Sequence, residues 1–241
     1  MEVKPVDILA IGVHPDDVEL SCSGTLLKQA QMGHSFGILD LTLGELGTRG
    51  TAELRTEEAA AAANLLGASF RHQLNIGDGF FEVNEKNQRQ ILRVIRACKP
   101  KIVLANALED RHPDHGRAAK LISEACFLSG LRRINSTWND VEQDAWRPSA
   151  VYHYTQDYYL APDLIVDISE FMDKKLESIR CFKSQFYDPN SKEPVSAISG
   201  QEFFDEVIAK ARVAGRSIGV RFGEPFQVKR PIGSKNLMDL L

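Results

Sequence analysis

The sequence lacks several features that mark specialised classes of protein. No run of about 20 apolar residues occurs in its 241 residues, so no segment is predicted to span a membrane. Residues 1–7 hold no basic stretch followed by an apolar one, which argues against a signal peptide and predicts a cytoplasmic protein. With 29 basic and 33 acidic side chains, the chain also lacks the strong positive charge that wrapping of nucleic acid requires.

Cysteine is scarce, and no glycine fingerprint for a dinucleotide follows the first apolar segment. The four cysteines (Cys22, Cys98, Cys126 and Cys181) form no C-x-x-C pair, so we expect free thiols in or near a core. The remaining composition, 43% apolar and 26% charged, is that of an ordinary globular protein. A chain of this length can form one α/β domain.

Apolar segments alternate with helical ones in the first half of the chain. Strands are predicted at residues 6–13, 35–42, 71–76 and 101–105. Helices are predicted at residues 24–31, 52–66, 85–98 and 114–129. This alternation predicts an α/β fold, a Rossmann-like, mostly parallel sheet with helices on both faces. Right-handed crossovers would then bring the carboxyl ends of the strands to one edge, where such sheets bind ligands.

The second half is less regular. Strands are predicted at residues 150–154, 164–168 and 222–228, helices at 169–186 and 202–218, and an exposed loop at 187–200. No linker or repeat calls for a second domain, so a single domain over residues 1–241 with a small C-terminal extension is expected. Trp138 and Trp146 lie in a polar connection, where they could anchor a loop or a subunit contact.

Two short histidine motifs each come soon after a predicted strand. The first is His14-Pro15-Asp16-Asp17, and the second is His112-Pro113-Asp114-His115. Asp residues after a strand often only cap the next helix. Two such motifs at one edge of a sheet are harder to explain as caps, because His and Asp are also ligands for Zn²⁺.

The spacing indicates how a metal could be held. His14 and Asp17, three residues apart on a turn, can converge on one ion, and His115 can supply a third ligand. Three protein ligands and an open water position are typical of catalytic zinc. Asp16, His112 and Asp114 stay uncommitted, and a carboxylate or an imidazole beside the metal can act in acid–base chemistry or stabilise an oxyanion. Fe²⁺ is compatible with the same ligands.

Three segments carry a resemblance to a known family. GVHPDDVELSCSGTL, LGELGTRGTAELRTEEA and EDRHPDH resemble the PIG-L/LmbE-like zinc-dependent N-acetylglucosamine deacetylases. The resemblance runs over nearly the whole chain, and it is greatest to the bacillithiol-biosynthesis branch, which deacetylates N-acetylglucosaminyl malate. It implies a hydrolase of a small N-acetylglucosamine conjugate, and a homo-oligomer, with a hexamer reported for relatives.

The resemblance also implies residue roles. His14, Asp17 and His115 match the metal ligands, and Asp16 matches the general base. His112 matches the imidazole that stabilises the oxyanion or protonates the amine, and Asp114 matches the carboxylate partner of that imidazole. Arg55 and, less closely, Arg111 match arginines of the substrate pocket, where a malate carboxylate would suit a guanidinium. The alternative for Arg55 is a helix-surface ion pair, and for Arg111 a plain surface charge.

Two positions depart from relatives. Asp110 stands where the mycothiol branch has a tyrosine, and Phe222 stands where bacillithiol relatives tend to have one. The first departure argues against a mycothiol-type substrate, and the second implies a different gate to the pocket. The alternative functions are a deacetylase of another N-acetylglucosamine compound, chitobiose-like or mycothiol-type, and a Rossmann-like binding module without activity.

Overall fold

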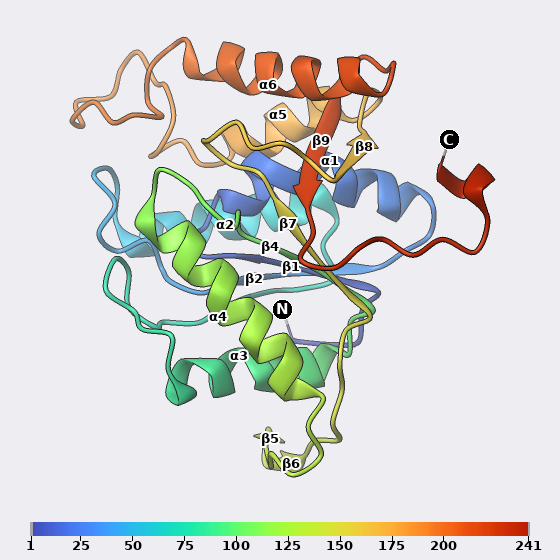
Figure 1. Cartoon of the computed structure of the whole chain (residues 1–241). Helices are drawn as coiled ribbons and strands as arrows, with labels where there is room; N and C mark the ends of the chain where they lie inside the picture. Colours follow the sequence, from blue (N-terminus) through green and yellow to red (C-terminus); the bar gives the residue numbers. More distant parts are fainter. Residues whose placement is uncertain (1, 241) are drawn as a thin grey trace.

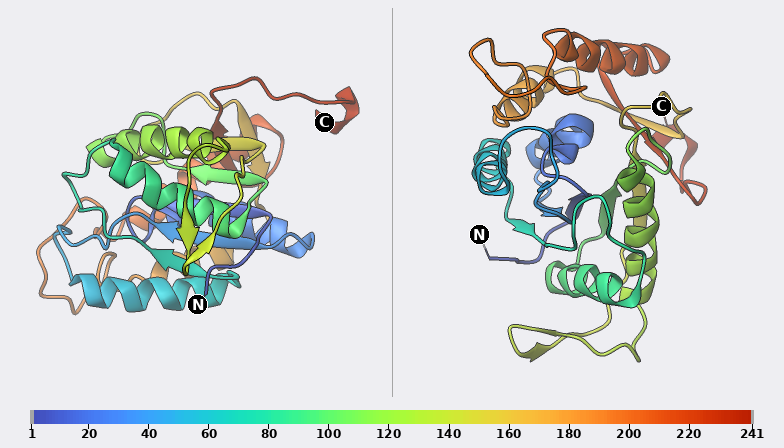
Figure 2. Two further views of the ribbon diagram at one scale, coloured as in Figure 1. Left: turned by 90° about the horizontal axis from the view of Figure 1, so that it is seen from below. Right: turned by 90° about the vertical axis from the view of Figure 1, so that its left-hand side faces the viewer.

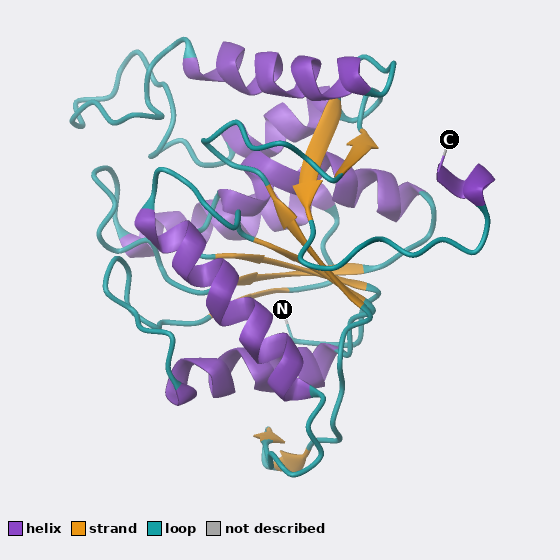
Figure 3. Ribbon diagram, viewed as in Figure 1, coloured by secondary structure: helices purple, strands orange, loops and turns teal. Residues whose placement is uncertain are grey.

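The computed structural model describes residues 2–240 and has one large sheet between layers of helices (Figures 1 and 3). The order of its seven strands is β3-β2-β1-β4-β7-β9-β8. They are β1 (Ile8–Gly12), β2 (Phe36–Asp40), β3 (Arg71–Gln73), β4 (Ile102–Ala105), β7 (Ala150–Tyr154), β8 (Leu164–Asp167) and β9 (Gly223–Gln227). The first five strands in this order pair in parallel, and β9 is antiparallel to both β7 and β8. The predicted mostly parallel α/β sheet is confirmed.

Helices cover both faces of the sheet (Figure 2). Helices α3 (Glu85–Cys98) and α4 (Pro113–Ser129) pack on one face, and α1 (Asp17–Gln31) and α2 (Ala52–Leu66) pack on the other. Every residue of β1 is buried, because alternate side chains point to the two helical layers. This double burial explains why the strand is a continuous apolar run in the sequence.

An outer layer is formed by α5 (Met172–Arg180) and α6 (Phe203–Ser217), which lie above α1 and the β8–β9 pair in Figure 1. Their apolar side chains form a third core cluster, which includes Phe222 at 6% exposure. The guanidinium groups of Arg212 and Arg221 lie against the Phe222 ring. Phe222 is therefore a packing residue here, whereas its neighbours Gly223 and Glu224 line the cavity described below.

Helix α1 begins at Asp17, seven residues before the predicted start at residue 24. The first turns hold Glu19, Ser21 and Ser23, all of them buried, so no amphipathic pattern marks them in the sequence. Glu19 is compensated by Arg71, whose Nη1 lies 2.6 Å from its carboxylate. The prediction failed because it rested on apolar spacing alone.

The connection between α4 and β7 contains a hairpin, β5 (Thr137–Trp138) with β6 (Val141–Glu142), that the sequence did not predict. It extends below α3 in Figure 1. Trp138 packs edge-on against His72, and Trp146 Nε1 donates to the Pro100 carbonyl at 2.7 Å. Both tryptophans thus anchor this connection to the body of the same chain.

Two further expectations from the sequence concern membrane-spanning segments and the cysteines. None of the helices at residues 2–240 is long and apolar enough to cross a membrane. The four cysteines are free thiols, as predicted, and three of them are buried. A short 3-10 helix (Leu237–Leu240) ends the described chain.

Candidate metal and catalytic site

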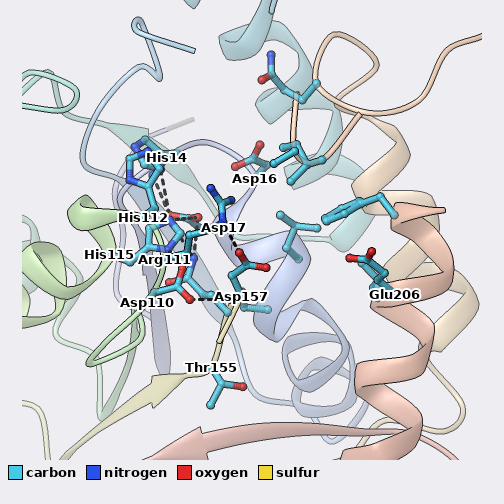
Figure 4. Close-up of a pocket in the computed structure, with 18 of the residues that line it drawn as sticks. His14, Asp16, Asp17, Asp110, Arg111, His112, His115, Thr155, Asp157 and Glu206 are labelled. Carbon is cyan, nitrogen blue, oxygen red and sulfur yellow. Dashed lines mark hydrogen bonds and ion pairs between the residues drawn. The ribbon is translucent and has the colours of Figure 1, made fainter. Parts of the chain in front are cut away.

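The two histidine motifs meet at the carboxyl edge of the sheet. His14 follows β1, while His112 and His115 begin α4 after β4. Their ring centroids lie 4.7 Å apart for His14 and His112, 5.6 Å for His14 and His115, and 5.2 Å for His112 and His115. Figure 4 shows the three rings together at one end of a pocket. The fold thus joins residues that are far apart in the sequence.

The carboxylate of Asp17 lies between two of these rings. Its Oδ2 is 3.8 Å from His14 Nδ1, and its Oδ1 is 3.3 Å from His115 Nε2. Ligands at 2.0–2.2 Å from a tetrahedral zinc ion lie roughly 3.3–3.6 Å from one another. Both distances from the Asp17 carboxylate to a ring nitrogen are close to this spacing.

The other nitrogen of each ring faces a carboxylate. His14 Nε2 lies 3.0 Å from Asp78 Oδ1, and His115 Nδ1 lies 2.5 Å from Asp110 Oδ2. Such partners fix the orientation of metal-binding imidazoles. Burial lowers the pKa of each histidine, but the facing carboxylates outweigh it and raise the pKa to about 10 for His14 and about 9 for His115.

Asp78 and Asp110 were not predicted as site residues. Asp78 follows β3, so its position at a strand end was a usable signal. Asp110 stands five residues before His115 on a loop, and only the folded loop directs it to the ring. The backbone N–H groups of Asp157 and Tyr158 hold its second oxygen at 2.8 and 2.9 Å.

Asp17 is buried and held by further donors. The backbone N–H of His14 and the side-chain amide of Asn106 each donate to Oδ2 at 2.9 Å, and Gln156 donates to Oδ1 at 2.9 Å. Burial favours the protonated acid, yet His115 and His14 hold the pKa of Asp17 well below its usual range. The side chain is thus an ionised, fixed carboxylate, the form that binds a cation.

Two alternative ligand groups share His14. One combines it with His112 and His115, and the other with Asp78 and Asp114, with ligand atoms within 4.8 Å of one another. The second group faces the Nε2 side of His14, where Asp78 is hydrogen-bonded to the ring and Asp114 Oδ2 lies 3.5 Å from Nε2. Among the described residues, both the group of three histidines and the group of one histidine with two carboxylates could hold a divalent metal.

Asp16 adopts a backbone conformation that is rare for its residue type. Its φ is 132°, and it is the N-cap of α1 without making a side-chain cap bond. Such strain persists where the surroundings enforce it, and it is common at functional sites. Burial raises the pKa of Asp16 to about 6, with Arg55 opposing the rise. A carboxylate that titrates near neutrality is well suited to general-base chemistry.

Arg55 contacts this carboxylate directly. Its Nη2 lies 2.8 Å from Asp16 Oδ2 and also donates to the Pro15 carbonyl at 3.0 Å, while Nη1 donates to the Gly44 carbonyl at 3.3 Å. The side chain is 6% exposed, so it is no surface arginine, although it does line the pocket. Contact with a substrate carboxylate stays a prediction, because these bonds direct the guanidinium to Asp16.

His112 is the N-cap of α4, where its Nδ1 accepts from the Asp114 N–H at 3.3 Å. Burial and the neighbouring His14 and His115 lower the pKa of His112. The expected pairing of the Asp114 carboxylate with this ring is not what the structure has. The Asp114 carboxylate instead accepts a hydrogen bond from Arg117, one helical turn along α4, at 2.7 Å. It also accepts from the Gly79 N–H at 2.8 Å, and this contact places it on the side of His14.

Arg111 lies at the outer rim of the site, half-exposed. Its Nε donates to the Asp157 carboxylate, which is also 3.3 Å from Lys210 Nζ. Two cations therefore share one carboxylate at this rim. Arg111 lines the pocket, as expected of a substrate-binding residue, but it is not a free charge.

The pocket beyond the motifs is a cavity of about 590 Å³. Its far wall is α6, which faces the histidine cluster across the open space in Figure 4. Its lining side chains there are apolar and charged: Phe203, Glu206, Val207 and Lys210 of α6, with Ile198 from the loop before the helix. The cavity is large enough for a small-molecule ligand that extends well past the histidines.

The comparisons with known proteins agree with this geometry. The PIG-L family profile, described as GlcNAc-PI de-N-acetylase, matches residues 9–126, which include both motifs. Diacetylchitobiose deacetylase of Thermococcus kodakarensis is 33% identical over 74% of this chain and 70% of its own length. A probable N-acetyl-alpha-D-glucosaminyl L-malate deacetylase 2 of Bacillus anthracis is 25% identical over 74% of this chain and 81% of its own length.

A solved structure extends the likeness to the whole fold. The crystal structure of a conserved protein from Thermus thermophilus superposes with a TM-score of 0.83 and 34% identity. The match covers 95% of this chain and 97% of that one. From its fold, its paired histidine motifs and these matches, the chain belongs to the PIG-L family of LmbE-like deacetylases.

Proposed function

We propose that the protein is a metal-dependent hydrolase that removes the acetyl group from an N-acetylglucosamine conjugate. The observation that carries the proposal is the Asp17 carboxylate at 3.8 Å from His14 Nδ1 and 3.3 Å from His115 Nε2, beside the strained Asp16. His14, Asp17 and His115 would hold Zn²⁺ or Fe²⁺, since imidazole nitrogen and carboxylate oxygen suit both ions.

When bound, such an ion would act as a Lewis acid, which makes water a nucleophile at neutral pH and polarises a carbonyl group. Asp16 then takes the proton of the attacking water, while Arg55 holds its carboxylate in place. Water oxygen adds to the acetyl carbon, the bond from carbon to nitrogen breaks, and acetate and a free amine leave. The proton that Asp16 takes from water returns to the leaving nitrogen, either from Asp16 itself or by way of His112. His112, beside His14 and His115, also donates a hydrogen bond to the developing oxyanion.

The charges around the cavity bear on the rest of the substrate. The lining residues include four Arg or Lys side chains, and each of them is in an ion pair with a carboxylate. The pairs are Arg55 with Asp16, Lys175 with Glu224, and Arg111 and Lys210 with Asp157. A malate group would have to compete with these carboxylates, whereas a neutral sugar would not. We therefore propose that the preferred aglycone is an uncharged second sugar and not malate, which the sequence resemblance favours.

Acetate release from a substrate panel tests both the proposed reaction and the proposed aglycone. The panel contains N-acetylglucosamine, diacetylchitobiose and N-acetylglucosaminyl malate, each with and without a chelator. Chelator-sensitive release with the highest kcat/KM for diacetylchitobiose supports the full proposal. A preference for the malate conjugate overturns the aglycone argument alone. Absence of release from every member contradicts the proposed function and favours a binding module.

A further inference from the structure

A second cluster of buried charge lies beside the catalytic motifs, where α5 and β9 meet α1. Lys175 of α5 and Glu224 of β9 form an ion pair with 2.6 Å between Nζ and Oε1, and each side chain is 3% exposed. Both residues line the cavity, yet neither has a part in the chemistry proposed above. Burying two charges is costly, so a pair at this position calls for a reason.

The ion pair contacts the backbone of α1, which is a continuous helix from Asp17 to Gln31. The N–H of Gly24 donates to Glu224 Oε1 at 3.0 Å, and the next N–H, of Thr25, donates to Oε2 at 2.6 Å. The Leu20 carbonyl accepts from Lys175 Nζ at 2.7 Å. The two charges therefore bind donor and acceptor groups of the same turn.

Gly24 makes this approach possible. A Cβ at this position would lie 3.0 Å from Glu224 Oε1 and 2.9 Å from the Cβ of Ile168. Glycine in a helix interior is otherwise destabilising relative to alanine. A methyl group here would crowd both the Glu224 carboxylate and Ile168 without changing any charge, so Gly24→Ala disturbs the contact by steric means.

The same turn supports Asp16. The N–H of Leu20 donates to the Asp16 carbonyl at 2.9 Å, while the Leu20 carbonyl is held by Lys175. One residue thus links the ion pair to the strained backbone of Asp16, and Asp17 is the first residue of the helix that the pair grips. A strained conformation needs such external support to persist.

We propose that Lys175 and Glu224 are positioning residues, which hold the first turns of α1 and thereby keep Asp16 and Asp17 in the geometry for base and metal ligand. The proposal rests on the proposed function for the roles of these two aspartates. It adds that an ion pair on two other elements, outside both motifs, sets metal affinity and turnover.

Two variants test it from different sides. Gly24→Ala displaces the carboxylate sterically, and the double variant Lys175→Met with Glu224→Gln removes both charges at once. The matched control is Lys28→Met, because Lys28 also ties α1 to another strand, donating to the Asp167 carbonyl of β8 at 2.9 Å. That contact lies at the far end of the helix from Asp17.

For each variant we would measure the Zn²⁺ dissociation constant by chelator competition, kcat and KM, the midpoint of urea unfolding, and hydrogen exchange at the Leu20 amide. Both test variants should bind Zn²⁺ about tenfold or more weakly, the usual effect of changing residues that orient metal ligands. Their kcat should fall by about tenfold or more with little change in KM, and the Leu20 amide should exchange faster. Lys28→Met should leave all of these near the wild-type values.

Wild-type Zn²⁺ affinity and kcat in a folded test variant would overturn the proposal. If the double variant does not fold, Gly24→Ala decides alone, since it keeps every charge. If the wild-type chain deacetylates nothing, the proposed function fails. The Zn²⁺ constant and the Leu20 exchange rate then still decide whether the ion pair positions the helix.

Discussion

Removing the guanidinium of Arg55 should shift the pH dependence of catalysis upwards. In the structure its Nη2 lies 2.8 Å from Asp16 Oδ2, and both side chains are 6% exposed. Burial raises the pKa of Asp16 to about 6, and Arg55 opposes that rise by favouring the ionised form. In Arg55→Met the carboxylate stays buried but loses its cation, so its pKa must rise further.

The size of the shift follows from the contact. A hydrogen bond to a charged group contributes about 1.5–3 kcal/mol, and about 1.4 kcal/mol corresponds to one pH unit. The acidic limb of kcat/KM should therefore move up by about one to two pH units, because the base acts only when ionised. Near pH 6.5 the variant should lose about 3- to 25-fold in kcat/KM, and part of this loss should be recovered above pH 8.

Arg111→Met is the matched control, because it removes another arginine of the same cavity whose carboxylate partner is Asp157. Its acidic limb should stay at the wild-type position. The reasoning is refuted if the acidic limb of Arg55→Met coincides with that of the wild type. A loss that is independent of pH and confined to an anionic substrate would instead assign Arg55 to substrate recognition.

Two further predictions concern metal and stability. Dialysis against a chelator should abolish activity, and added Zn²⁺ or Fe²⁺ should restore it. The apparent metal affinity should weaken as the pH falls, because protons compete with the metal for His14 and His115. Unchanged affinity between pH 8 and 6 would contradict the assigned ligands. His153 is 1% exposed, and burial lowers its pKa to about 4. Its unfolded pKa is near 6.5, so protonation favours the unfolded chain, and stability should fall by roughly 3 kcal/mol as the pH drops from 7 to 4. In urea titrations His153→Gln should lose this component of the pH dependence, and an identical pH dependence in the variant would contradict the assignment.

The sequence predicted the parts of the site that lie next to strands. A buried strand is a continuous apolar run in the sequence, so the ends of β1 and β4 could be predicted. The chemistry of the motifs that follow these strands could be predicted too. Asp78 and Asp110 were missed because their roles depend on which ring they face after folding. For the same reason the hydrogen bond from Arg117 to the Asp114 carboxylate was not predicted, because sequence spacing alone does not determine which partner the carboxylate binds.

Buried polar residues limited the prediction of the fold. The first turns of α1 carry Glu19 and other polar side chains inward, so apolar periodicity placed the start of the helix too late. Lys175 and Glu224 lie 49 residues apart in the chain, and each would be taken for a surface residue from its type. Long-range ion pairs of this kind leave no local pattern, and here they lie against the helix that carries Asp16 and Asp17.

The central claim is that Asp17 binds the metal while its neighbour Asp16 acts on water. Metal content measured beside kcat in Asp16→Asn and Asp17→Asn tests it most directly, because the two changes are chemically the same. Asp16→Asn should keep about one ion per chain and lose about 10²- to 10⁴-fold in kcat, the usual contribution of a general base. Asp17→Asn should lose metal and activity together. A metal-free Asp16→Asn beside a metal-loaded Asp17→Asn would contradict the account.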